Sequence, residues 1–243
     1  MTKSILITGA STGIGAETAR HLAAGNKIFI HYNSSKESAE KVAADIKGKG
    51  GEACLLQADL SKEDGCRGLV KAVSMESEKL DVLVNNAGGL IKRQSVREYD
   101  WNLMEETFAL NTFSAMIVAS LCIPLLEKGE DPCIINITSV AMRHGGPTAT
   151  IYGASKSALD SFTRGIAKEL APAIRVNAVA PGVILTPFHD KVSTSEQLEA
   201  WREGNPLKKH GEAIHIAETI RFIIDNDFVN GETIDINGGL FMR

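Results

Sequence analysis

A tyrosine and a lysine four residues apart are the residues of this chain best suited to acid–base chemistry. Tyr152 and Lys156 would lie one turn apart on the same face of a helix, and Ser139 lies thirteen residues before the tyrosine. At about 4 Å and an effective dielectric near 20, the ammonium would stabilise the phenolate by roughly 4 kcal/mol, or about three pK units. The set predicts a phenol that protonates a carbonyl oxygen, or deprotonates an alcohol in reverse, while the serine hydroxyl holds that oxygen. Taken alone, the pair fits equally well a tyrosine packed on a sheet and a lysine in solvent.

A glycine-rich turn follows the first predicted strand and leads into a helix. Its glycines would let the backbone approach a diphosphate closely, and the helix N-terminus would supply free N–H donors. The glycine spacing does not match the GxxxxGK pattern of nucleoside-triphosphate loops, which disfavours that class of site. We expect this turn to bind a dinucleotide through Gly9, Ser11, Thr12, Gly13, Ile14 and Gly15.

Short runs rich in β-branched residues alternate with segments of helical period along the chain. The predicted strands are 4–8, 27–32, 53–57, 80–84, 133–138, 175–180 and 232–236. Several of them are apolar at both parities, which is typical of strands covered on both faces. Because no linker or internal repeat appears, we expect a single α/β domain with a parallel sheet and helices on both faces.

Two further features bear on how the elements are arranged. Ser34, Ser61 and Ser95 each precede an acidic residue by three positions, a pattern that predicts capping boxes at three helix starts. Residues 181–205 carry no strand pattern but contain an amphipathic piece around Trp201. This segment is predicted to form a substrate lid over the carboxyl ends of the strands, where ligands bind in such sheets.

Composition excludes several classes of function. The 243 residues carry 26 Lys plus Arg and 30 Asp plus Glu, with no basic block, so a nucleic-acid binder is disfavoured. The longest apolar stretch, residues 115–126, is shorter than the roughly 18 to 20 residues of a membrane helix, so no membrane span is expected. The N-terminus lacks a signal-peptide pattern, and we expect a cytoplasmic protein. The cysteines form no ligand cluster, so we expect no metal site and free buried thiols at Cys54, Cys66, Cys122 and Cys133.

In combination these motifs resemble the short-chain dehydrogenase/reductase family, in its shorter branch without an appended substrate domain. The resemblance extends over essentially the whole chain. Its residues are Thr8 to Gly15, Asp59, Asn85 to Gly88, Asn111, Ser139, Tyr152, Lys156, Pro181-Gly182 and Thr186-Pro187. The resemblance implies a Rossmann-like, doubly wound sheet of seven strands that binds NAD(H) or NADP(H).

The resemblance also implies roles for individual residues. Lys156 would hold the nicotinamide ribose, Asn111 would maintain a water-mediated proton relay through Lys156, and Asp59 would lie beside the adenine. Without this resemblance, Asn111 is better explained as an ordinary helix residue and Asp59 as a residue of the turn before a helix. Further cofactor contacts are expected at Tyr32, Asn33, Ser34, Leu60, Asn86, Ala87, Gly88, Tyr152, Lys156, Pro181, Gly182 and Thr186. A homodimer or homotetramer built from the long helices is implied as well.

The end of the second predicted strand indicates which cofactor binds. Residues 31–36 contain no acid that would repel a 2'-phosphate, whereas hydroxyls, Lys36 and a helix start could receive one. We therefore expect a preference for NADP(H), with NAD(H) possible. Thr12 stands where many NADP-dependent relatives carry a basic residue.

The substrate is the least defined part of the prediction. The C-terminal segment 231–239 and the chain length are similar to those of 3-oxoacyl-carrier-protein reductases, which implies an acyl-thioester substrate and acyl carrier protein as a partner. The cations nearest the site for an acidic carrier are Arg143 and Arg164, while residues 127–131 are largely acidic. A different ketone, sugar or alcohol is the alternative, and a non-catalytic NADPH-binding sensor or assembly subunit is a second. His144 and His189 are placed near the pocket without an assigned role.

Overall fold

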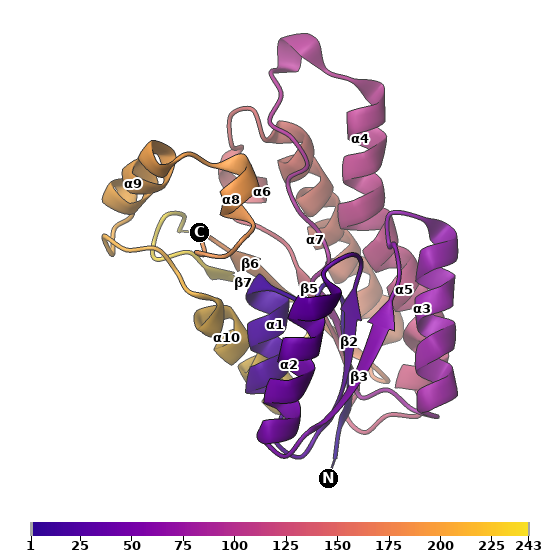
Figure 1. The fold of residues 1–243 in the computed structure, drawn as a ribbon. Coiled ribbons are helices and arrows are strands. Elements are labelled where there is room, and N and C mark those ends of the chain that lie inside the picture. Colours follow the sequence, from indigo (N-terminus) through magenta and orange to yellow (C-terminus); the bar gives the residue numbers. More distant parts are fainter. Residues whose placement is uncertain (1, 243) are drawn as a thin grey trace.

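A computed structural model describes residues 2–242 as one sheet with helices on both faces (Figure 1). Its seven strands are parallel, in the order β3-β2-β1-β4-β5-β6-β7. They span β1 Ser4–Ile7, β2 Lys27–Tyr32, β3 Glu52–Gln57, β4 Val82–Asn85, β5 Cys133–Ile137, β6 Arg175–Pro181 and β7 Thr233–Ile236. The order reverses between β1 and β4, so the predicted doubly wound Rossmann-like sheet is confirmed.

Alternate residues of the strands explain why helices cover both faces. In β1, Ile5 and Ile7 pack into one apolar cluster and Leu6 packs into the other. The first cluster lies under α1 Gly13–His21, α2 Lys36–Gly48 and α10 Ala213–Asp225. The second lies under α3 Glu63–Glu76, α5 Ser114–Leu126 and α7 Thr150–Leu170. A strand that is apolar at both parities therefore has two helical layers to pack against.

The fourth strand begins later than its apolar pattern predicts. Leu80 donates its backbone N–H to the carbonyl of Leu125, outside the sheet. Asp81 is fully buried and its carboxylate accepts the backbone N–H groups of Ser4 and Glu130. The paired register starts at Val82, although the backbone of Asp81 already bonds to Ser4 of β1 and Cys133 of β5.

The capping-box prediction was wrong for the first two helices. The N-cap residues of α2 and α3 are Ser35 and Lys62, one position later than predicted, and neither side chain forms a capping hydrogen bond. The hydroxyl of Ser61 instead donates to the carboxylate of Asp59 at 2.7 Å. Ser34 lies in the loop before α2, where its side chain is free to line a cavity.

At the third position the serine caps a different element from the one expected. Ser95 accepts the N–H of Arg97 in η1 Val96–Glu98, a single 3-10 turn. The following helix, α4 Trp101–Phe108, begins after Asp100, whose carboxylate accepts the N–H of Asn102 at 3.1 Å. An acid three residues after a serine therefore did not locate this helix start.

A π turn joins α4 to α5 in one long helix. The turn, η2 Ala109–Phe113, makes residues 101–126 continuous, with a mean hydropathy of 1.9 over the most apolar window. By length and composition this helix could span a membrane. Half of that window is buried inside the domain, and Val118 and Cys122 pack in the core beside α3. Packing in the core of the domain therefore explains why this long helix is so apolar.

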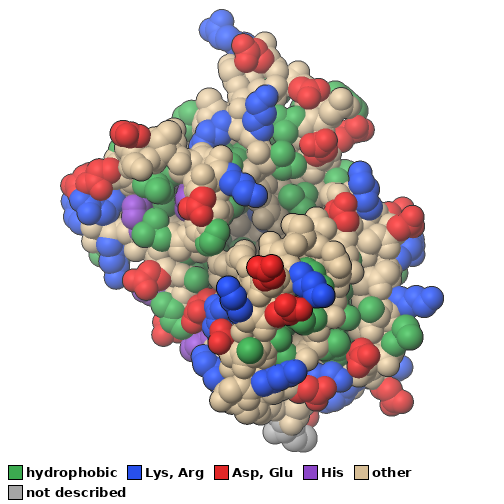
Figure 2. All heavy atoms as spheres, viewed as in Figure 1, with side chains coloured by type: hydrophobic (Ala, Val, Ile, Leu, Met, Phe, Trp, Pro, Cys, Tyr) green, Lys and Arg blue, Asp and Glu red, His purple; other side chains and the backbone are tan. Residues whose placement is uncertain are grey.

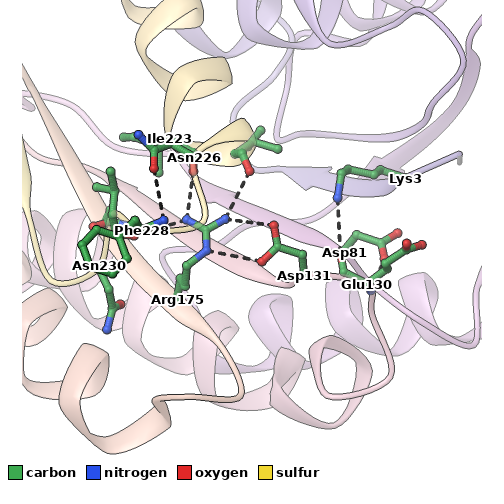
Figure 3. A network of polar contacts seen from close by, with 12 residues as sticks. Lys3, Asp81, Glu130, Asp131, Arg175, Ile223, Asn226, Phe228 and Asn230 are labelled. Carbon is green, nitrogen blue, oxygen red and sulfur yellow. Dashed lines mark hydrogen bonds and ion pairs between the residues drawn. The ribbon is translucent and has the colours of Figure 1, made fainter.

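Arg175 ties the amino end of β6 to the end of α10 (Figure 3). Its guanidinium donates to the carbonyls of Ile223 at 2.9 Å and Ile224 at 3.1 Å, which are among the last of that helix. Its other edge faces the carboxylate of Asp131 at 3.4 Å. The helix end thereby gains partners for carbonyls that no helical N–H reaches.

The carboxyl ends of the strands carry the more irregular segments. The arrows of β2 and β3 point toward the top of Figure 1, and α4, α8 His189–Val192 and α9 Ser195–Gly204 lie on that side. Acidic and basic side chains are interspersed over the face shown in Figure 2, with no area of a single charge. This distribution agrees with the near-balanced composition.

Candidate active site

A cavity of about 950 Å³ runs along the carboxyl ends of the strands, on both sides of the point where the strand order reverses. Most of the side chains singled out from the sequence line it. They are Gly9, Ser11, Thr12, Gly13, Ile14, Asn33, Ser34, Asp59, Leu60, Asn86, Ala87, Gly88, Ser139, Tyr152, Lys156, Pro181, Gly182 and Thr186. Gly15, Tyr32 and Asn111 do not line it. No group of three His, Cys, Asp or Glu side chains within residues 2–242 is arranged to hold a metal ion.

The glycine turn supports the cavity in two ways. Gly9 and Gly13 adopt φ values of +63° and +57°, in the left-handed region that favours glycine. Gly15 lies beneath the turn, because a Cβ there would be 2.4 Å from the carbonyl oxygen of Gly9. Helix α1 begins at Gly13, and Thr12 forms no side-chain cap, so the first N–H groups of the helix remain available to an anion.

A histidine that the sequence did not single out holds this turn in place. His31 is buried, and its Nδ1 accepts the backbone N–H of Gly9 at 2.9 Å. Its Nε2 lies 3.0 Å from the carbonyl of Ala58, to which it donates. Burial is the main cause that lowers the pKa of His31 below its ordinary value of 6.5. The polar residue inside an otherwise apolar strand was the available signal.

The side chain of Tyr32, which was expected to contact the cofactor, lies in the core and does not line the cavity. The strand alternates, so Tyr32 points to the same side as Ile28 and Ile30 and packs with them in the core. Its neighbours Asn33 and Ser34 leave the strand and do line the cavity.

Lys156 is buried beside the tyrosine. Its Nζ donates to the carbonyl of Ile137 at 2.8 Å and lies 6.0 Å from the centre of the Tyr152 ring. Burial lowers the pKa of Lys156 to about 8. The ammonium is therefore directed at a backbone carbonyl rather than placed against the phenol oxygen.

The expected lowering of the tyrosine pKa is wrong. Burial raises the pKa of Tyr152 above its ordinary value of 10, and a hydrogen bond with Ser139 acts in the opposite direction. The phenol is therefore protonated at neutral pH. A protonated phenol beside a serine hydroxyl is suited to donate a proton to a carbonyl oxygen.

Asn111 lies in the π turn and contacts the loop that follows β4. Its Oδ1 accepts the N–H of Gly89 at 2.8 Å, and its Nδ2 donates to the carbonyl of Gly89 at 2.9 Å. A Cβ on Gly88 would lie 2.6 Å from Asn111 Oδ1 and 3.0 Å from Lys156 Nζ. Only a glycine at position 88 leaves room for these two side chains, which both lie where its Cβ would be. Functional sites are a frequent location of π turns.

The opposite end of the cavity is rich in hydrogen-bond donors. Asn33, Ser34 and Ser35 line it at the start of α2, which has no side-chain cap. Among the described residues, Asp59 is the one acid in the lining, and hydrogen bonds from Ser61 lower its pKa. Lys36 points elsewhere and pairs with Glu40 at 3.7 Å.

Helices α8 and α9, from the segment predicted as a lid, close one side of the cavity. Aromatic rings form a row from the tyrosine outward: the ring centres of Tyr152 and Phe188 are 6.3 Å apart, those of Phe188 and His189 5.0 Å, and those of His189 and Trp201 6.1 Å. The guanidinium of Arg93 lies 5.6 Å from the Trp201 ring centre and continues the row. The sequence did not reveal the contributions of Phe188 and Arg93, because nothing local links these segments.

The two cations proposed near the site are already paired. Arg143 lies 3.4 Å from the carboxylate of Asp235 and 3.9 Å from that of Asp160, and its side chain is 18% exposed. Arg164, on α7, also pairs with Asp160. Arg143 is thus part of the internal structure. His144, like His189, lines the cavity.

Comparisons with known proteins agree with this architecture. A family model described as short chain dehydrogenase matches residues 3–197. The chain is 36% identical over 250 residues to the 3-oxoacyl-[acyl-carrier-protein] reductase FabG of Staphylococcus aureus, covering 100% of this chain and 99% of that protein.

Solved structures are similar over the same extent. A short chain dehydrogenase from Burkholderia cenocepacia in complex with NADP is 32% identical, with a TM-score of 0.90 over 98% of this chain and 97% of that one. The Pseudomonas aeruginosa RhlG/NADP active-site complex is 31% identical, with a TM-score of 0.91 over 98% of this chain and 96% of that one. With its strand order, glycine turn and full-length similarity, the chain belongs to the short-chain dehydrogenase family.

Proposed function

We propose that this protein is an NADP(H)-dependent oxidoreductase that reduces a carbonyl to an alcohol, or the reverse, with Tyr152 as the general acid or base. The observation that carries the proposal is the meeting of Ser139, Tyr152 and Lys156 in the cavity that the glycine turn also enters. The NADP complexes of two similar structures support the choice of cofactor.

The residues at both ends of the cavity fit a dinucleotide. The diphosphate would lie on the turn from Gly9 to Gly13, opposite the free N–H groups of α1. The 2'-phosphate of NADP would meet Asn33, Ser34 and the uncapped start of α2. Asp59 lies at the end of the next strand, which suits a place beside the adenine.

The catalytic roles follow from the contacts of each side chain. When bound, the cofactor supplies or accepts the hydride. Tyr152, protonated at neutral pH, donates its proton to the substrate oxygen, and Ser139 holds that oxygen by a hydrogen bond. The Lys156 ammonium, with the Ile137 carbonyl as one partner, retains donors for the ribose hydroxyls.

Asn111 acts as a positioning residue in this scheme. Its amide fixes the backbone of Gly89 and thereby the loop against which Asn111 and Lys156 both lie. A water held between these two side chains would carry the proton that replaces the one lost by the phenol. Residues 181–205 would serve as the substrate lid, since α8 and α9 supply one wall of the cavity.

A 3-oxoacyl thioester carried by acyl carrier protein is the first candidate substrate. The FabG relatives are named for this reaction and match the chain from end to end. The internal pairing of Arg143 weakens one argument for carrier docking, so another ketone, sugar or alcohol is the alternative. A non-catalytic NADPH-binding sensor or assembly subunit would have no need of the Ser139, Tyr152 and Lys156 set.

The assembly is proposed to be a homodimer or homotetramer. Trp101 and Phe113 on the long helix are 68% and 53% exposed, which leaves apolar surface for a second copy. A cytoplasmic location stays a prediction from the sequence.

The test is NADPH consumption with a 3-oxoacyl thioester beside plain ketones and sugars. Tyr152→Phe is expected to lower turnover by roughly 100-fold or more while NADPH binding stays within about twofold. Turnover of the thioester alone would support the acyl reductase. Turnover that survives in Tyr152→Phe would refute the acid–base assignment, and binding without turnover of any carbonyl would favour the sensor.

A further inference from the structure

We propose that the substrate carries an oxyanion, a carboxylate or a phosphate, and that Arg93 binds this group at the outer end of the cavity. The inference rests on the proposed reductase function, because it places the reacting carbonyl at Tyr152. It concerns the part of the substrate that does not react.

Arg93 is held in position by the wall formed by α8 and α9. Its Nε donates to the carbonyl of Val192, the last residue of α8, at 2.8 Å. The central carbon of its guanidinium lies over the ring of Trp201 on α9, 5.6 Å from the ring centre. The guanidinium is therefore oriented before any ligand arrives, which lowers the entropy cost of binding.

Most of the donors of this guanidinium are available. Arginine has five N–H donors in a planar fork, and the Nε contact uses one of them. In the described part of the chain, no carboxylate oxygen lies within 4.0 Å of an Arg93 nitrogen. Arg143, Arg164 and Arg175 by contrast all have acidic partners. The terminal nitrogens of Arg93 thus form a two-point binding edge of the kind that matches a carboxylate or phosphate.

The charges around this end of the cavity favour an anion. Arg93 and Lys191 both line it, whereas Asp59, the acid in the lining among residues 2–242, lies at the β3 end beside the glycine turn. Asp190, the acid next to Lys191 in sequence, is absent from the lining. The charged side chains that line this end of the cavity are therefore both cations, which favours an anionic ligand.

The wall between the tyrosine and the arginine is largely aromatic. Phe188, His189 and Trp201 follow one another from the Tyr152 ring to Arg93. Burial lowers the pKa of His189, so this imidazole is mostly neutral at pH 7. A substrate with a carbonyl at one end, an apolar middle and an anionic far end matches this order of surfaces. The phosphate of a phosphopantetheine arm and the carboxylate of an oxo acid both satisfy this pattern.

The experiment compares neutral and anionic substrates that are otherwise matched. One pair is a 3-oxoacyl thioester of pantetheine and the same thioester of phosphopantetheine; the other is a 4-oxo acid and its methyl ester. We expect the wild type to prefer the anionic member of at least one pair, through a lower KM. Preference within the first pair identifies a phosphate, and preference within the second a carboxylate.

Variants assign that preference to Arg93. Arg93→Gln is expected to reduce the preference at least about tenfold, and Arg93→Lys to restore part of it, because lysine keeps the charge but lacks the fork. Arg97→Gln is the matched control, since Arg97 lies four residues further along, in η1, is exposed and does not line the cavity. If Arg93→Gln raises the KM equally for both members of a pair, Arg93 only stabilises the packing of α8 and α9 and does not bind the anion. That result would overturn the inference.

A binding measurement separates this inference from the proposed function. In a Trp101→Phe background, Trp201 is the one remaining tryptophan and reports ligands beside Arg93 in the presence of NADP⁺. Anionic members are expected to change its fluorescence at lower concentration than neutral ones, and Arg93→Gln to abolish the difference. If no carbonyl is turned over but this difference appears, the anion site stands and the reductase proposal fails. If both members bind equally well in the wild type, the anion site is refuted.

Discussion

The imidazole of His31 and the backbone of Gly9 are joined by a hydrogen bond in which Nδ1 accepts the N–H at 2.9 Å. Because the opposite ring nitrogen donates to Ala58, the neutral ring has its proton on Nε2. Protonation of Nδ1 would place two donors against each other and remove the hydrogen bond. The charged groups nearest the ring include Asp59, which opposes the lowering of the pKa but does not reverse it.

Cofactor binding is therefore expected to weaken at acid pH. With a folded pKa below the unfolded value of 6.5, the unfolded chain takes up this proton first, so the free energy of unfolding falls as the pH drops below 6.5. His31→Asn keeps an acceptor near Gly9 but does not titrate, and should flatten the decline in both stability and NADPH affinity between about pH 7 and 5. Urea unfolding and fluorescence titration at each pH provide the measurement. The 2'-phosphate of NADPH also titrates in this range, but it affects both proteins equally. If stability and affinity fall with pH in parallel for the two proteins, the prediction is contradicted.

Lys156 should make the free energy of unfolding depend on pH in the alkaline range. Its folded pKa of about 8 lies below the ordinary 10.5, so between these values the unfolded state binds the proton and the folded state does not. The free energy of unfolding should rise with pH across this window, by up to about 3 kcal/mol. Lys156→Met should lack that rise, which is measured as the difference between the two proteins in denaturant unfolding from pH 7.5 to 10.5. A constant difference would mean that the lysine is not buried as described.

Alanine at position 88 should destabilise the protein more than alanine at position 89. The added Cβ of Gly88→Ala would lie 2.6 Å from Asn111 Oδ1, whereas the nearest atom for Gly89→Ala is on Phe188 at 3.8 Å. We expect losses of roughly 1–3 kcal/mol for the first and under about 0.5 kcal/mol for the second. Thermal unfolding of both variants checks this, and equal losses would show that Asn111 can move aside.

The cofactor preference should shift toward NADH when an acid is placed at the end of β2. Asn33→Asp puts a carboxylate beside the expected 2'-phosphate and leaves the diphosphate contacts intact. The ratio of NADPH to NADH affinity should fall by about tenfold or more, an effect of at least ~1.4 kcal/mol. Asn33→Gln serves as the neutral control. If the ratio is unchanged, the 2'-phosphate lies elsewhere.

The sheet was predictable because each strand is marked by a pattern of neighbouring residues in the sequence. Each strand is a short apolar run between helices, so its position could be located to within one or two residues, and the parallel arrangement followed from the alternation. Helix starts were less predictable. Ser34 and Ser61 match the capping pattern but lie one residue early, and the Ser61 hydroxyl donates to Asp59 instead of capping the helix.

The residues of the site likewise include some that the sequence could identify and some that it could not. The glycine turn, Tyr152 and Lys156 have types and spacings that carry their chemistry, and the structure brings them into one cavity. His31 and Arg93 escaped notice because their contacts join segments distant in sequence: Gly9 for the first, Val192 and Trp201 for the second. The direction of the Tyr152 pKa was also mistaken, since spacing on a helix cannot show that Lys156 turns toward Ile137.

The π turn at Ala109–Phe113 has a consequence for chain length. A π turn holds one more residue than a regular turn, and one residue corresponds to about 100° around a helix axis. Helices α4 and α5 are therefore out of phase, and each can bury its own apolar side. Removing a single residue from this turn would restore regular hydrogen bonding yet rotate all of α4 relative to the sheet and carry Asn111 away from Gly89. A regular helix would have regular backbone hydrogen bonds but would misplace the side chains that this segment contributes to the active site. We therefore expect a deletion to be tolerated least in this short segment.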